Sequence, residues 1–232
     1  YNSTNPDGDF YVEVGKPIGQ IYGYITDGYY TIDDFNYVYD QATGKATWTL
    51  KDGIASSAAI TGSPEYPGTL KLRKLDGSGD DVTAADRTVI GNTLPKATGG
   101  FNINAQWKGF DVAAYFNYSL GNDVYNANKL ELTSYPLTRR YGNLLTTMEG
   151  RFTYIDRNTG ESLLNDIDRL RDANANASIW SPIISRVPVH SWAVEDGSFL
   201  RLSNVTIGYT LPKHITRKIM IETLRVYVTG YN

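Results

Sequence analysis

The sequence predicts an all-β fold, namely a segment of an antiparallel transmembrane β-barrel with long extracellular loops. Three observations lead to this prediction. Two runs alternate with a period of two residues around a tight turn, and short turns alternate with long polar excursions along the chain. The composition, with 18 Tyr and 22 Gly among 232 residues, suits a protein of many strands and turns. From the pattern alone, a soluble β-sandwich or barrel that buries its apolar face on a core remains open.

The stretch 99–126 carries the clearest strand signal. Side chains on a strand point alternately to opposite faces, so a period of two separates an apolar face from a polar one. The second run, 110–118, is close to the roughly 9–11 residues that a tilted strand needs to cross a bilayer. Aromatic residues end the apolar stripes, as in the interfacial girdles of membrane barrels. The apolar sets around the Lys108-Gly109 turn are Phe101, Ile103, Ala105 and Trp107, then Phe110, Val112, Ala114, Phe116 and Tyr118.

Composition excludes several classes of protein. The chain is 41% hydrophobic with a net charge of −3, so it can build a core and has no basic stripe for nucleic acid. It contains no cysteine, which excludes disulfide scaffolds, zinc–thiolate sites and thiol catalysis. No apolar run approaches the roughly 18 residues of a transmembrane helix. A membrane-spanning form must therefore be a barrel, because only helices and closed barrels satisfy their backbone in lipid.

The first part of the chain predicts short strands followed by a long excursion. A strand is expected at 10–14, and a kinked strand at 21–24, where glycine interrupts the alternation. Residues 29–98 form the first excursion, with a small hairpin of 36–39 and 45–50 around a turn at 42–44.

The segment 76–86 has oxygen ligands spaced like the start of a calcium-binding EF-hand loop. Two features argue against calcium. Asp81 stands where the sharp turn of an EF-hand needs glycine, and Asp86 comes one residue too early to close the loop. We therefore favour a turn whose aspartates bond local backbone amides, and we predict no metal site.

The second excursion, 119–197, is expected to hold one short helix within 163–177. A strand then covers 198–211, a compact basic turn 212–223, and a last strand 224–232. In the first of these strands Val205 and Ile207 share a face, whereas Leu200 and Leu202 have the opposite parity. This mismatch predicts a β-bulge near Ser203.

Short connections between strands alternate with long ones along the chain. The short turns are 108–109 and 212–223, and the long excursions are 29–98 and 119–197. Outer-membrane barrels have short periplasmic turns and long extracellular loops. We therefore interpret residues 1–232 as part of one barrel domain, with the turns periplasmic and the excursions extracellular.

No catalytic constellation is recognisable. His190 and His214, the two histidines, have neither triad nor metal-ligand spacing, and we interpret both as loop residues. Asp33 and Asp34 are adjacent, so on a strand they would point apart and could not flank a sugar as glycosidase carboxylates do. We predict that the chain is not an enzyme and holds no cofactor.

Four segments of the chain carry a resemblance to a known family. They are PIGQIYGYITDG (17–28), DRTVIGNTLPKATGGFNINAQWKGFDVAAYFNYSLGNDVYN (86–126), WAVEDGSFLRLSNVTIGYTLP (192–212) and LRVYVTGYN (224–232). In this order they closely resemble the C-terminal half of the barrel in SusC/RagA-type TonB-dependent transporters, the outer-membrane nutrient importers of Bacteroidetes.

The resemblance implies a barrel of about 22 strands with a plugged lumen. It also implies a SusD-like lipoprotein lid, energy from the TonB–ExbB–ExbD system, and a glycan or oligopeptide substrate in the outer membrane of a Gram-negative bacterium. No signal sequence, TonB box, plug domain or final strands are recognisable, so we expect an internal piece of about six strands, paired at both edges with further strands.

The two leading interpretations place the same residues differently. A transporter barrel would turn one apolar set toward lipid, whereas a soluble carbohydrate-binding β-sandwich module would bury that set in a closed core. A third interpretation is a surface barrel without transport. The expected membrane-facing residues are Phe101, Ile103, Trp107, Phe110, Val112, Phe116, Val205, Ile207, Val226 and Val228.

Aromatic residues on the excursions could stack on sugar rings or peptide side chains, or contact the lid. Loop packing is the alternative role for any one of them. The candidates are Tyr29, Tyr30, Trp48, Tyr66, Tyr135 and Trp180.

Overall fold

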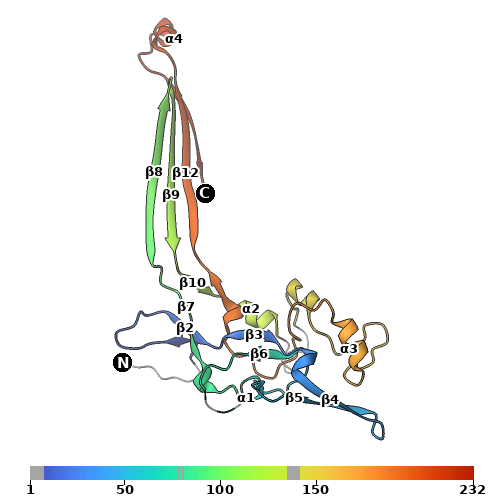
Figure 1. The fold of residues 1–232 in the computed structure, drawn as a ribbon. Helices are drawn as coiled ribbons and strands as arrows, with labels where there is room; N and C mark the ends of the chain where they lie inside the picture. The colour runs from blue at the N-terminus through green and yellow to red at the C-terminus, as the bar shows by residue number, and fades with distance from the viewer. Residues whose placement is uncertain (1–7, 78, 80, 135–141) are drawn as a thin grey trace. The chain divides into compact units, whose positions relative to one another are not determined.

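The computed structural model describes residues 8–77, 79, 81–134 and 142–232 (Figure 1). The chain divides into two compact units that alternate along the sequence. Unit 1 comprises Tyr1–Asn92 and Val124–Glu195, and unit 2 comprises Thr93–Asp123 and Asp196–Asn232. Each unit is described by itself below.

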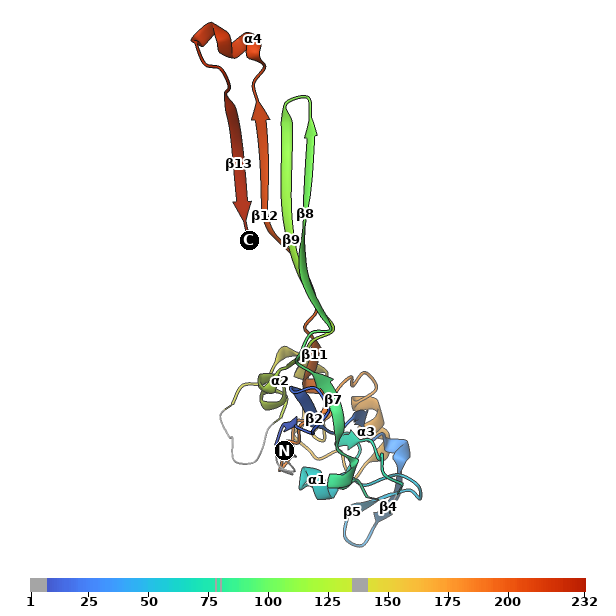
Figure 2. The same ribbon diagram turned by 90° about the vertical axis from the view of Figure 1, so that its left-hand side faces the viewer.

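Unit 2 is a four-stranded antiparallel sheet in the order β13-β12-β9-β8 (Figure 2). The strands are β8 (Ala97–Trp107), β9 (Phe110–Leu120), β12 (Phe199–Thr210) and β13 (Arg225–Tyr231). Lys108 and Gly109 join β8 to β9 with φ angles of 47° and 91°. Positive φ at both central residues is the type I′ geometry that fits the twist of a two-residue hairpin. The predicted hairpin is therefore confirmed.

The predicted β-bulge is also present. In the pairing of β12 with β9, the register shifts between Leu202 and Asn204, so Ser203 has no partner on β9. The extra residue moves Leu200 and Leu202 onto the same face as Val205. One inserted residue thus aligns two halves of β12 that have opposite parity in the sequence.

The predicted basic turn 212–223 folds into two short helical turns. They are α4 (Lys213–Thr216) and η5 (Arg217–Ile219). The backbone N–H of Leu211 donates to the carbonyl oxygen of Leu224 at 2.9 Å and closes the base of the turn.

Unit 1 is an irregular assembly of short strands and helices. The predicted small hairpin is confirmed as β4 (Phe35–Asp40) and β5 (Lys45–Leu50), and the predicted helix within 163–177 is confirmed as α3 (Ile167–Ala173). The strand expected at 10–14 is limited to β1 (Phe10–Tyr11). No helix among the described residues is long and apolar enough to cross a membrane. The strands are β1 (Phe10–Tyr11), β2 (Gln20–Gly23), β3 (Thr26–Tyr29), β4 (Phe35–Asp40), β5 (Lys45–Leu50), β6 (Leu70–Leu72), β7 (Thr88–Asn92), β10 (Asp123–Tyr125) and β11 (Val194–Asp196). The helices are α1 (Ala58–Thr61), α2 (Ala127–Leu132) and α3 (Ile167–Ala173), with 3₁₀ turns η1 (Ile32–Asp34), η2 (Ala84–Asp86), η3 (Thr146–Gly150) and η4 (Ser191–Ala193).

Two apolar clusters form the core of unit 1, and each combines residues from both excursions. The excursions therefore fold together as one unit. For example, the indole N–H of Trp48 donates to the carbonyl oxygen of Leu164 at 3.0 Å. The first cluster contains Tyr24, Leu70, Leu72, Val82, Met148, Ile179, Trp180 and Ile184. The second contains Tyr30, Ile32, Phe35, Trp48, Phe152, Leu163 and Leu170.

Candidate functional site

The apolar face of unit 2 is the first candidate functional surface. Residues directly opposite each other on antiparallel strands project from the same face of a sheet. Val112 pairs with Ile207, and Ile207 pairs with Val228, so one row runs across three strands. The same registers bring all ten residues of the predicted apolar set onto one face, which we call the apolar face.

Most of the apolar face is exposed within the described chain. Trp107 is 69% exposed, Val226 59% and Val228 74%. Contiguous exposed apolar patches of more than a few hundred Å² mark contact with protein, ligand or membrane. The apolar face therefore needs an apolar neighbour.

Aromatic rings lie at both ends of the apolar face. Near the Lys108-Gly109 turn, the rings of Phe110 and Tyr209 are 4.5 Å apart, and Trp107 is directly opposite Phe110. Toward the other end, Phe101 and Phe116 stack with their centroids 4.9 Å apart. Rings that bracket an aliphatic band are typical of the two interfaces of a membrane barrel.

The opposite face of the sheet is polar and contains an ion pair that sequence reasoning missed. Arg225 on β13 reaches Asp111 on β9 with nitrogen–oxygen distances of 2.9 and 2.5 Å. The pair crosses the central strand at Gly208. A Cβ atom at Gly208 would lie 2.6 Å from the guanidinium and 2.7 Å from the carboxylate, so glycine leaves the space for the pair. The opposite charges and the glycine are visible in the sequence, but only the register aligns them.

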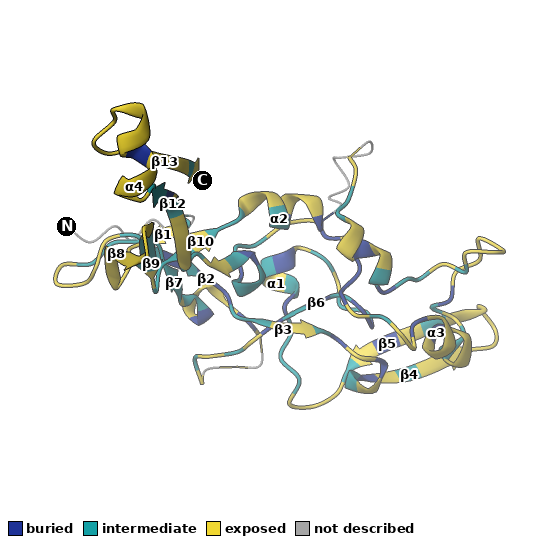
Figure 3. Ribbon diagram, turned by 90° about the horizontal axis from the view of Figure 1, so that it is seen from above, coloured by how far each residue is buried: buried dark blue, intermediate teal, exposed yellow. Residues whose placement is uncertain are grey.

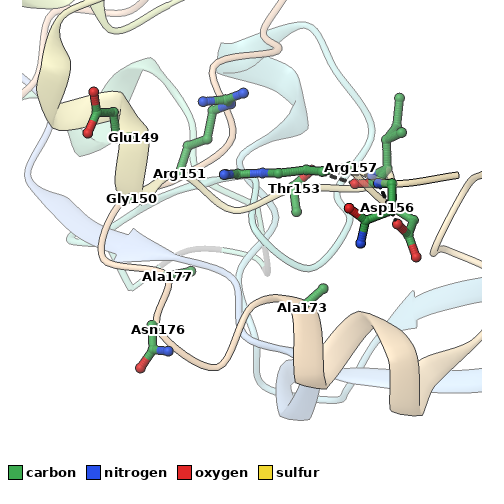
Figure 4. Close-up of a pocket in the computed structure, with 11 residues that line it drawn as sticks. Glu149, Gly150, Arg151, Thr153, Asp156, Arg157, Ala173, Asn176 and Ala177 are labelled. Atoms are coloured by element: carbon green, nitrogen blue, oxygen red, sulfur yellow. Dashed lines mark hydrogen bonds between the residues drawn. The ribbon is translucent and has the colours of Figure 1, made fainter. Parts of the chain in front are cut away.

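A polar pocket of about 380 Å³ opens on unit 1 (Figure 4). Its lining includes Glu149 of η3, Arg151 directly after η3, Arg157 in the connection to α3, and Asn176 shortly after α3. Asp156 is held by an ion pair with Arg169 at 2.8 Å. Backbone amides of Asn158 and Thr159 and the guanidinium of Arg169 lower the pKa of the Asp156 carboxyl. The pocket can bind a polar or charged group, and sequence reasoning did not identify it.

The predicted loop aromatics have packing roles in unit 1. Tyr30, Trp48 and Trp180 belong to the buried clusters, and Tyr29 and Tyr66 pack against them. The Tyr29 hydroxyl donates to the carbonyl oxygen of Ala177 at 2.9 Å. Tyr135 lies outside the described residues. Tyr30, Trp48 and Trp180 are buried and Tyr29 and Tyr66 are half-buried, so a role of these rings in substrate or lid contact stays a prediction.

The segment 76–86 is organised by Asp86, whose side chain is fully buried. One carboxylate oxygen accepts from the amides of Leu75 and Asp76 at 2.6 and 2.8 Å, and the other from the amide of Thr83 at 2.7 Å. Burial acts to raise the pKa of Asp86, but these amides and the Lys74 ammonium outweigh it and lower the pKa. Asp86 therefore holds a turn through local amides. Asp80 lies outside the described residues.

The remaining candidate catalytic groups are engaged separately. Asp33 pairs with Arg171 at 3.0 Å, whereas Asp34 pairs with Lys71 at 3.3 Å. His190 is buried against Trp180, with ring centroids 5.4 Å apart. Among the described residues, no group of three or more acidic, histidine or cysteine side chains could hold a metal ion.

Comparisons with known proteins find relatives among TonB-dependent receptors. No family model matches the chain. It is 28% identical to the TonB-dependent receptor P3 of Formosa agariphila over 94% of its own length, and 29% identical to the receptor P26 of the same bacterium over 80%. The chain spans 18% and 17% of these two relatives. They are named receptors rather than enzymes, in agreement with the prediction that this chain is not an enzyme.

Two of the solved structures that this chain resembles in fold are of a peptide importer. The chain matches the RagAB peptide importer in its closed-closed state with a TM-score of 0.55 and 21% identity, over 100% of this chain and 20% of that one. A second structure, the RagAB peptide transporter, gives 0.53 and 22%, over 100% of this chain and 21% of that one. The predicted all-β fold and the predicted resemblance are confirmed: the chain is similar in sequence and in fold to about a fifth of a SusC/RagA-type TonB-dependent transporter.

Proposed function

We propose that this chain forms part of the barrel wall of a TonB-dependent, SusC-like importer in the outer membrane of a Bacteroidetes-like bacterium. In this proposal residues 1–232 belong to one barrel domain. The excursions 29–98 and 119–197 are extracellular, and the turns 108–109 and 212–223 are periplasmic. The importer takes up glycans or oligopeptides with a SusD-like lipoprotein and is driven by TonB–ExbB–ExbD.

The observation that carries this proposal is the alignment of the apolar face. Ten apolar residues from four strands lie on one face, and the bulge at Ser203 adds Leu200 and Leu202 to it, while the asparagine and glutamine residues of β8 lie on the other face. Lipid-facing and lumen-facing residues alternate in this way in transmembrane barrels. A soluble β-sandwich is less favoured because it would cover this face with a second sheet, whereas Ile103 and Ile207 are more than half exposed.

The proposed substrate class draws on the peptide importer whose fold the chain shares and on the polar pocket of unit 1. Five of the six aromatic residues that we considered for substrate contact pack within unit 1, and the sixth lies outside the described residues. We therefore propose that ligand or lid contacts of unit 1 are made by its exposed polar surface. The pocket beside Arg151 and Arg157 is the first candidate, because guanidinium groups bind carboxylates through two parallel hydrogen bonds.

The test compares arginine substitutions on the two faces of the sheet in the full-length protein. Val112→Arg and Phe116→Arg place a charge on the proposed lipid face, which costs about 2–4 kcal/mol near the bilayer midplane. Asn104→Arg places the same charge on the polar face of β8. We expect the first two variants to be depleted from the outer membrane and the third to assemble normally.

Membrane levels are read by fractionation and immunoblotting, with folded barrels identified by their resistance to unfolding in cold detergent. Equal levels of the three variants would overturn the proposed orientation. Recovery of residues 1–232 as a soluble, cooperatively folding monomer would instead favour the β-sandwich.

A further inference from the structure

The turn 212–223 has an inverted pattern of burial. Its one buried side chain is Thr216, whereas its apolar residues point outward. Ile219 is 57% exposed and Met220 is 97% exposed. In Figure 3 the segment around α4 is coloured almost wholly as exposed. A turn that met only water would bury its isoleucines before its threonine. The exposed apolar residues are Ile215, Ile219, Met220 and Ile221.

The fold of the turn fixes this arrangement. Met220 has a φ of 59°, a left-handed conformation that ends η5 and reverses the chain. The amide of Ile221 then donates to the carbonyl oxygen of Thr216 at 3.1 Å, which ties the second half of the turn to the first. The apolar side chains are therefore held outward by hydrogen-bonded backbone.

Cationic residues are interspersed with these apolar residues along the turn. Lys213, Arg217 and Lys218 are all exposed, and Glu222 is the acid of the segment. The neighbouring turn adds Lys108, whose ammonium lies 5.0 Å above the ring of Trp107. Apolar side chains mixed with lysine and arginine are typical of segments that lie in a membrane interface and attract anionic lipids.

The turn also continues the apolar face of the sheet. Tyr209, which packs on Phe110 of β9 at the aromatic end of that face, lies at the end of β12 that leads through Leu211 into the turn. Val226, opposite Tyr209, lies where the chain leaves the turn for β13. The apolar face, the aromatic rings and the basic turn therefore succeed one another along the same hairpin.

We propose that the turn 212–223 is a membrane anchor that inserts Ile215, Ile219, Met220 and Ile221 into the headgroup region of a phospholipid leaflet and binds anionic phospholipid through Lys213, Arg217 and Lys218. The inference rests on the proposed function, because it requires the apolar face to meet lipid. Each cation near an anionic surface contributes about 1 kcal/mol, or about a fivefold preference for anionic lipid.

The test uses the full-length protein in vesicles of phosphatidylcholine mixed with phosphatidylglycerol. A bimane fluorophore is attached at Met220→Cys, and quenching is measured with brominated phosphatidylcholine or brominated phosphatidylglycerol. Val228→Cys reports the apolar face, and Asn104→Cys reports the polar face. The signal of labelled protein without the introduced cysteine is subtracted. We expect quenching at positions 220 and 228 but not at 104, with brominated phosphatidylglycerol the stronger quencher at 220.

The triple variant Lys213→Gln, Arg217→Gln, Lys218→Gln should lose the preference for phosphatidylglycerol at position 220 and leave quenching at 228 unchanged. Quenching at 228 without quenching at 220 would overturn the anchor while leaving the barrel orientation intact. An absence of quenching at 228 would contradict the proposed function itself. A phosphatidylglycerol preference that persists in the triple variant would overturn the role of the cations.

Discussion

His190 makes the stability of unit 1 depend on pH. Its side chain is buried, it lies beside the Trp180 ring, and its Nδ1 contacts the hydroxyl of Thr26. Burial, with the nearby Lys129 ammonium as a smaller cause, lowers the pKa of His190 from 6.5 to about 3. The unfolded chain therefore takes up a proton on this ring at a higher pH than the folded chain does.

The sign and size of the effect follow from this difference. Above pH 6.5 the ring is neutral in both states and the full stability is present. As the pH falls from 6.5 toward 3, protonation of the unfolded state removes stability at up to about 1.4 kcal/mol per pH unit. At pH 5 the loss is about 2 kcal/mol. Carboxyl groups contribute little above pH 5, and the pKa of Asp86 is lowered further by its amide donors.

Hydrogen exchange of the full-length protein can measure this loss. We expect amide protection in peptides that cover 20–30 and 185–195 to fall about thirtyfold between pH 7.5 and 5, after correction for the intrinsic pH dependence of exchange. His190→Gln should be less protected at pH 7.5 but should show no further fall. His214→Gln, at an exposed position of unit 2, is the control and should keep the parental fall. The same fall in His190→Gln would refute the reasoning.

Three further predictions concern single positions. Gly208→Ala should lower the thermal unfolding midpoint of the full-length protein in detergent, because the new Cβ displaces the ion pair that crosses this strand, whereas Gly230→Ala meets one ordinary contact at 3.8 Å and should not; equal midpoints would contradict this role. Asp86→Asn should lower the free energy of unfolding by about 1–3 kcal/mol, because the backbone amides lose a charged acceptor. Titration of the parent protein with calcium, followed by calorimetry, should detect no micromolar site that this substitution removes. Deletion of Arg201 should lower the membrane level of the barrel, because it turns Leu200 to the polar face, whereas deletion of Ser203 removes only the unpaired residue, leaves both leucines on the apolar face and should be tolerated; equal membrane levels of the two deletions would contradict this register.

Local sequence signals predicted the local structure of the sheet. The alternation of apolar and polar residues predicted the hairpin of β8 and β9, and the change of parity between Leu202 and Val205 predicted the bulge. Both features depend only on residues that are neighbours along the chain. The α3 helix and the β4–β5 hairpin were predicted for the same reason. The ion pair between Asp111 and Arg225 could not be predicted from the sequence, because β12 lies between the two strands that carry these residues. The register of β12 with each neighbour decides which side chains meet across it.

The packing of the two excursions against each other could not be predicted from the sequence pattern. Trp48 and Tyr30 stand in polar segments, and such segments give no periodicity from which burial could be inferred. Their partners come from the other excursion, as in the contact of Trp48 with Leu164. The two excursions are separated in sequence by β8 and β9, so long-range pairing, rather than any local signal, creates the core of unit 1.

The regular placement of exposed apolar side chains in unit 2 is the physical basis of the proposed function. In unit 1, Ile21 and Tyr30 are fully buried, as water requires of large apolar groups. In unit 2, Val228 is 74% exposed although its strand alternates as regularly as any in the chain. An accidental patch would not keep phase through a bulge and across four strands, because each change of register would scatter it between the faces. The regularity of the apolar face therefore supports the proposal that this face meets an apolar surrounding.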